Sequence, residues 1–300
     1  MASFKSHLLW WYLRYKKFQN RKLRARIGIT EQRAWIEKLG QEKKLIPNSK
    51  VESLSAHGIP AEWMTVPQSR EDRVMLYLHG GGYQIGSPKS HRSLVSHLAH
   101  YTRSKVLQID YRLAPEFPFP AGLDDTVTAF DWLCKQIDPK RIVVAGDSAG
   151  GGLALALLLK WKEEKREMPG GLVLLAPWVD LAAEPESFEK MVKKDPILIP
   201  KYLVAGAVSY AGKEDRQNPF ISPLDGDLSG LPPTLIQLGD MDILLPEGKA
   251  LAEKLKTEGV PTELQVWKNM VHVWHFVGPA LPESGKAIQK IANFMDQRIK

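Results

Sequence analysis

From about residue 70 to its end, the chain alternates short apolar runs, typical of strands, with longer runs of helical period. The strand-like runs are residues 73–79, 105–111, 141–146, 171–178, 233–239 and 262–267. The helix-like runs are residues 91–101, 123–137, 153–161, 246–259 and 283–297. Such alternation is typical of α/β proteins, so we expect a mostly parallel central sheet with helices on both faces.

Two stretches do not follow this alternation. The first 45 residues contain a basic segment and a helical pattern at residues 30–39, and residues 184–231 are rich in Pro, Asp, Lys and Tyr without a clear strand pattern. Long irregular insertions in compact domains are usually functional. We therefore predict an α/β domain formed by residues 46–183 and 232–300, covered by a helical cap formed by residues 1–45 and 184–231.

The charge distribution bears on the possible partners. The net charge is +7, but residues 1–26 carry eight basic residues and no acidic one, which leaves the other 274 residues at −1. A general nucleic-acid-binding surface is therefore not expected. No apolar stretch approaches the roughly 20 residues that span a bilayer. Cys134 is the single cysteine, so neither an intramolecular disulfide nor a multi-cysteine metal site can form, and we expect a cytoplasmic protein.

One motif joins a strand to a helix through glycines and a serine. The sequence VAGDSAGGG places Ser148 between Gly146 and Gly150, after the apolar run that ends at Val144. A strand, G-x-S-x-G and a helix in this order are typical of a nucleophile elbow, in which a sharp turn exposes the serine hydroxyl. The N-terminus of the following helix also directs its free N–H groups and positive dipole end toward that position. Ser148 is therefore a candidate nucleophile.

A second glycine-rich motif follows the first strand-like run. His79 is followed by three glycines, and consecutive glycines allow neighbouring backbone N–H groups to converge on one point. That convergence is what a hole for a developing oxyanion requires.

Together these motifs resemble the hormone-sensitive lipase family of α/β-hydrolases. The resemblance rests on HGGGY, DYRLAPEFPFPA, GDSAGG, APWVDL, NPFISPL and NMVHVWHF, which occur in this order from about residue 70 to the C-terminus. It implies an α/β-hydrolase fold with a helical cap, ester substrates of short to medium acyl length, and neither a metal nor an organic cofactor. A homodimer is also consistent with the family.

The other members of a catalytic triad are expected after the nucleophile, in the order acid and then histidine. Of the two histidines beyond Ser148, the resemblance favours His272, at the end of NMVH, over His275. It likewise favours Asp242 over Asp240 in the run GDMDIL.

The fold's usual oxyanion hole combines the N–H of the residue after the nucleophile with donors from a glycine-rich loop. Here that loop is residues 79–82, which we call the glycine loop. The expected donors are Ala149, Gly81 and Gly82. Tyr83 follows the glycines and is either a substrate-pocket residue or a packing residue. Asp147 and Glu116 lie in family-like motifs but receive no chemical role.

These residues predict a serine carboxylic-ester hydrolase that acts through an acyl-enzyme. An amidase, a lactonase or a deacetylase could use the same triad, and pocket shape would distinguish them. A non-catalytic small-molecule receptor on this fold is a further alternative, which the presence of all three triad residues disfavours.

An apolar stripe runs along the N-terminal segment. Phe4, Leu8, Trp11, Tyr15 and Phe18 recur at helical spacing, with basic residues largely off the stripe. Packing of this stripe over the active site as part of the cap is favoured. Contact with an anionic membrane surface is the alternative.

Overall fold

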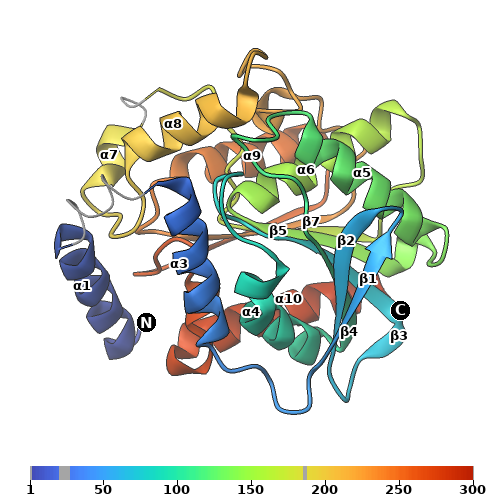
Figure 1. Cartoon of the computed structure of the whole chain (residues 1–300), viewed down its shortest axis with the longest axis horizontal. Coiled ribbons are helices and arrows are strands. Elements are labelled where there is room, and N and C mark those ends of the chain that lie inside the picture. The colour runs from blue at the N-terminus through green and yellow to red at the C-terminus, as the bar shows by residue number, and fades with distance from the viewer. Residues whose placement is uncertain (1, 20–27, 185–187, 300) are drawn as a thin grey trace.

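A central sheet organises the molecule, whose computed structural model describes residues 2–19, 28–184 and 188–299. The described residues build an eight-stranded sheet in the order β1-β2-β4-β3-β5-β6-β7-β8 (Figure 1). The strands are β1 Lys50–Ala56, β2 Ile59–Thr65, β3 Arg70–Leu78, β4 Ser104–Ile109, β5 Ile142–Asp147, β6 Gly171–Leu175, β7 Thr234–Gly239 and β8 Thr262–Trp267. Strand β2 is antiparallel to β1 and β4, and all pairs from β4 to β8 are parallel. The predicted mostly parallel sheet is confirmed.

The β1–β2 hairpin is an element that the hydrophobic pattern did not predict. Ala56 pairs with Ile59 across a two-residue turn, in which His57 and Gly58 have φ values of 51° and 90°. Positive φ at both central residues is the conformation whose twist matches that of two antiparallel strands. The hairpin extends the sheet beyond β4 by antiparallel pairing.

Helices cover both faces of the sheet, as predicted. On one face lie α4 Pro88–Thr102 and α10 Pro282–Arg298, and on the other lie α5 Ala121–Cys134, α6 Ala149–Glu163 and α9 Leu245–Thr257 (Figure 1). Side chains of β3 alternate between the two layers: Val74 and Leu76 pack with α5 and α6, whereas Met75 and Tyr77 pack with α4 and α10. Successive side chains of a strand point to opposite faces, and helices cover both faces here. The central strands are therefore apolar at consecutive positions.

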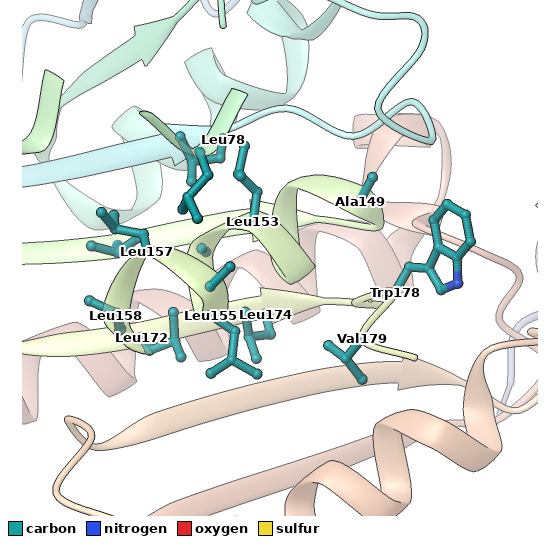
Figure 2. Packing of buried hydrophobic residues seen from close by; sticks show 14 of the residues in the cluster. Leu78, Ala149, Leu153, Leu155, Leu157, Leu158, Leu172, Leu174, Trp178 and Val179 are labelled. Atoms are coloured by element: carbon teal, nitrogen blue, oxygen red, sulfur yellow. The ribbon is translucent and has the colours of Figure 1, made fainter. Parts of the chain in front are cut away.

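Helix α6 is buried along most of its length. Figure 2 shows its leucines packed among apolar side chains of the sheet, with Ala149 and Trp178 near the end of the helix that follows Ser148. Ala149, Leu153 and Leu155 have no exposed surface. The dense packing holds the start of α6, and with it Ser148, in one position.

The predicted cap segments contain further helices. These are α1 Phe4–Gln19, α3 Ile29–Gln41, α7 Glu189–Val192, α8 Pro200–Ala211 and η3 Pro223–Asp225, while η1 Pro139–Arg141 and η4 Trp274–Ala280 belong to the α/β part. Helix α8 lies against the glycine loop, since a Cβ on Gly206 would be 3.7 Å from the carbonyl oxygen of Gly82. The domain boundaries remain predictions.

The favoured position of the N-terminal stripe was wrong. Its five side chains, Phe4, Leu8, Trp11, Tyr15 and Phe18, are 53–79 % exposed. The opposite face of α1 makes the contacts instead: Leu9, Trp10 and Leu13 pack against a buried cluster that includes Met270 and Trp274. The helix has two apolar faces, and helical period alone does not indicate which one meets the core.

The inner face of α1 supports the loop that follows α7. The Trp10 indole N–H donates to the carbonyl of Lys194, and the Lys17 ammonium donates to the carbonyls of Asp195 and Leu198. Thus α1 does contact the predicted cap insertion, through side chains other than the predicted stripe. None of the helices in the described ranges is long and apolar enough to cross a membrane.

Candidate active site

Ser148 occupies a strained turn between β5 and α6. Its φ and ψ are 52° and −122°, a conformation uncommon for a residue with a side chain. A Cβ on Gly146 would lie 2.3 Å from the carbonyl oxygen of Gly150, and a Cβ on Gly150 would lie 2.1 Å from that of Leu78. Gly146 is therefore required for the chain to turn this sharply, and Gly150 is required for the turn to pack against the end of β3. The Ser148 carbonyl accepts a hydrogen bond from the N–H of Trp178, which fixes the turn further.

Three of the predicted residues form one chain of hydrogen bonds. The Ser148 Oγ lies 2.9 Å from Nε2 of His272, and Nδ1 of His272 lies 2.8 Å from Oδ2 of Asp242. Asp242 has no exposed surface, and its other oxygen accepts a hydrogen bond from the N–H of Leu244. The serine is 9 % exposed and the His272 side chain is 9 % exposed. The site thus combines a fixed acid and imidazole with a serine that retains some exposure.

The glycine loop lies beside this group and depends on its glycines. Gly81 and Gly82 have φ values of 124° and 62°, and a Cβ on Gly81 would lie 2.0 Å from the carbonyl oxygen of Ile85. The N–H of Gly80 donates to the Asp147 carboxylate at 3.0 Å. Since Asp147 precedes Ser148, this bond ties the loop directly to the turn that carries the serine.

Comparisons with known proteins show the family of this chain. A family model for the α/β-hydrolase fold matches residues 75–276. A solved structure of an esterase from the bacterial hormone-sensitive lipase family is 39 % identical to this chain, with a TM-score of 0.92 and 100 % of each chain covered. The chain belongs to the hormone-sensitive lipase family of α/β-hydrolases. Among its relatives are an acetyl-hydrolase of Streptomyces hygroscopicus, 40 % identical over 78 % of this chain and 79 % of the relative, and an ethyl acetate hydrolase of Pseudomonas putida, 30 % identical over 92 % and 90 %.

In this member of the hormone-sensitive lipase family, Asp240 and His275 take no part in the hydrogen bonds that join Ser148, His272 and Asp242. Asp240 accepts a hydrogen bond from the N–H of Asn269 and so joins two loops. His275 is 1 % exposed, and its Nε2 lies 2.7 Å from Oε1 of Gln237. Burial lowers the pKa of His275 to about 3, so its imidazole is neutral at ordinary pH.

Asp147 holds the loop and the turn together, a role that the sequence did not reveal. Besides the Gly80 N–H, its carboxylate accepts a hydrogen bond from the Tyr77 hydroxyl at 2.6 Å and lies 3.5 Å from Nε2 of His91. Burial acts to raise the pKa of Asp147, but His91, Tyr77 and the Gly80 N–H together lower it below its ordinary value. Asp147 is therefore a charged anchor beneath the glycine loop.

Asp195 is a second residue that the sequence did not single out. It follows α7, and one carboxylate oxygen accepts a hydrogen bond from the N–H of Ile243, the residue after Asp242, at 2.8 Å. Its other oxygen accepts the N–H groups of Ile197 and Leu198. Burial, and then repulsion by Asp242, raise the pKa of Asp195. Its only sequence signal is the dipeptide Asp-Pro, which indicates a turn and nothing about the site.

Tyr83 and Glu116 both connect segments of the protein. The Tyr83 ring is 2 % exposed and stacks on Tyr210 of α8 with a centroid distance of 3.7 Å, so it joins α8 to the glycine loop. That Tyr83 lines the substrate pocket remains a prediction. Glu116 forms an ion pair with Arg33 of α3 at 2.7 Å. Within the described ranges, the structure contains no cluster of three or more His, Cys, Asp or Glu side chains suited to a metal ion.

Proposed function

We propose that this protein is a serine carboxylesterase that hydrolyses short- to medium-chain esters with Ser148, His272 and Asp242 as its catalytic triad. Family membership and the esterases among its relatives identify it as a carboxylic-ester hydrolase. The observation that carries the assignment of residues is the hydrogen-bonded chain from Ser148 through His272 to Asp242. A nucleophile, a base and a group that orients the base are the parts that acyl transfer requires.

The proposed reaction has two halves. Ser148 Oγ attacks the ester carbonyl while His272 Nε2 accepts its proton, and Asp242 stabilises the imidazolium. The N–H groups of Gly81, Gly82 and Ala149 stabilise the oxyanion, aided by the positive end of the α6 dipole. The C–O bond to the leaving alcohol then breaks as His272 returns the proton to it. Water, deprotonated by His272, attacks the acyl-enzyme and releases the acid and the free serine.

The pH dependence should identify His272 as the base. Burial disfavours its charged form, but Asp242, with contributions from Asp195 and Asp147, raises its pKa above the ordinary 6.5. Because the neutral imidazole is the base, kcat/KM should rise with pH through a midpoint above 6.5. The measurement is kcat/KM for a soluble ester across mildly acidic to alkaline pH.

The same profile separates the two histidines. A base with the pKa of His275, about 3, would be neutral throughout this range, so a flat profile would contradict the assignment. As a control, Asp242→Asn should lower the midpoint and reduce kcat by about 10⁴-fold, since the imidazole loses its negative partner and its orientation.

Acyl-chain length tests the substrate class. Helix α8 lies against the glycine loop at Gly82, and we expect it to limit the space beside the proposed oxyanion hole. One relative is named an acetyl-hydrolase and another an ethyl acetate hydrolase. We expect kcat/KM for p-nitrophenyl esters to be highest from acetate to hexanoate and to fall by at least about tenfold for palmitate.

Two further arms of that experiment test the alternatives. Faster turnover of the matched p-nitroanilides would favour an amidase, and maximal turnover of long-chain triglyceride emulsions would refute the chain-length limit. Specific binding of an ester without turnover would indicate a receptor. A cytoplasmic location and a homodimer remain predictions.

A further inference from the structure

Helix α1 presents a second apolar face that the fold does not use. The inner face, with Leu9, Trp10 and Leu13, packs on the protein. Six large apolar side chains lie on the outer side at exposed fractions of 53–79 %. They are Phe4, Leu8, Trp11, Tyr12, Tyr15 and Phe18. At 100° per residue these six positions span about a third of the helix circumference, so they form one continuous strip, which we call the outer face of α1.

Basic residues accompany the outer face. Lys5 and Lys16 are exposed and lie along one edge of it at helical spacing. Arg14 and Lys17 belong to the protein side, where they donate to backbone carbonyls of the loop around Asp195. The helix has no acidic residue. The exposed charges that α1 itself places beside the outer face are therefore positive.

An apolar groove continues the outer face toward η4. It has a volume of about 290 Å³ and is lined by Leu8, Leu9 and Tyr12 on α1, by Val277 and Ala280 on η4, and by Leu281, with Lys5 at its wall. The apolar surface available to a partner thus extends beyond one helix.

We infer that the outer face of α1 docks the protein on the surface of an anionic phospholipid bilayer. A helix with aromatic and aliphatic residues on one face and lysines along its edge lies in the interfacial plane, with the apolar side chains among the acyl chains and the lysines near the headgroups. Tyrosine and tryptophan favour this interface because each has an apolar ring and a polar group.

Charge favours the bilayer over a second copy of the chain. Pairing two outer faces would bring the lysines of both helices together, and α1 offers no carboxylate to compensate them. An anionic lipid surface supplies that compensation along the whole helix. The inference is independent of the ester chemistry proposed above.

The test uses the full chain and vesicles of phosphatidylcholine alone or of an equimolar mixture with phosphatidylglycerol. Co-sedimentation should show at least about tenfold stronger partitioning to the anionic vesicles, weakened by salt. The triple variant Trp11→Ser, Tyr15→Ser, Phe18→Ser should lose this partitioning. The double variant Lys5→Gln, Lys16→Gln should lose the preference for anionic over neutral vesicles.

A matched control replaces the same residue types elsewhere on the surface. Trp35, Tyr202 and Phe117 are 48 %, 38 % and 49 % exposed, so changing all three to serine removes the same residue types, with somewhat less exposed surface. This control should bind anionic vesicles like the unmodified protein. Thermal unfolding checks that all variants are folded. We expect the melting temperatures of the outer-face variants to change little, because these side chains contribute little to the core.

Three results would overturn the inference. Equal binding to both kinds of vesicle would remove the electrostatic part, and an equal reduction of binding in the control would remove the role of α1. The third is that the unmodified protein is a dimer in solution, the outer-face triple variant is a monomer, and neither binds vesicles. That result would identify the outer face as an interface between two copies of the protein.

Discussion

Replacing Ser148 by alanine should lower kcat for ester hydrolysis by about a million-fold while the fold is retained. The change removes the attacking oxygen, and the residual rate would come from binding and the oxyanion hole alone. Alanine is smaller than serine, so it fits the strained turn without moving the backbone. The substitution mainly removes the hydrogen bond between Oγ and His272.

Initial rates on p-nitrophenyl acetate and a thermal unfolding curve check this prediction together. The variant should melt close to the unmodified protein and should still bind the substrate. A folded Ser148→Ala protein with a substantial fraction of normal turnover would contradict the mechanism. Inactivation through unfolding would be visible in the melting curve.

His272→Ala should reduce kcat nearly as much as Ser148→Ala, because the triad residues act as one unit. The serine loses its base, and the buried Asp242 loses its imidazole partner. His275→Ala provides the matched comparison, since it removes the same side chain three residues further along. The rate per folded molecule should then remain close to normal.

His275 should matter for stability although it does not matter for the rate. His275 is buried, and its removal leaves a cavity and an unpartnered Oε1 on Gln237. The free energy of unfolding should fall by roughly 2–4 kcal/mol. Denaturant unfolding and kcat, measured on both variants, check the pair. A His275→Ala protein that is folded but inactive, beside an active His272→Ala protein, would reverse the assignment.

The architecture and the turn that carries Ser148 could be predicted from local sequence, whereas the choice of Asp242 and His272 came from the family resemblance. Strand β5 is apolar at consecutive positions because helices cover both of its faces, and this pattern indicates a central parallel strand. Gly146 is required by an approach of 2.3 Å that a Cβ would make to Gly150 within the same five residues, so the sharpness of the nucleophile turn is encoded locally. Gly150 is required by an approach of 2.1 Å to Leu78 of β3. The β1–β2 hairpin escaped prediction although His57-Gly58 carries its turn, because its half-exposed strands lack a continuous apolar run.

Interactions between distant segments were decided only by the tertiary structure. Asp195 reaches the N–H of Ile243 across 48 residues of sequence, and Asp147 reaches Gly80 across 67, and neither spacing has a local signature. For α1, helical period determined that apolar residues share a face, but the helix has two such faces. Which face is buried depends on the partner surface around Met270 and Trp274, which exists only after the sheet and η4 have assembled. Local sequence therefore specified the elements and the turn carrying Ser148, whereas long-range packing decided which groups hold that turn and which face of α1 remains exposed.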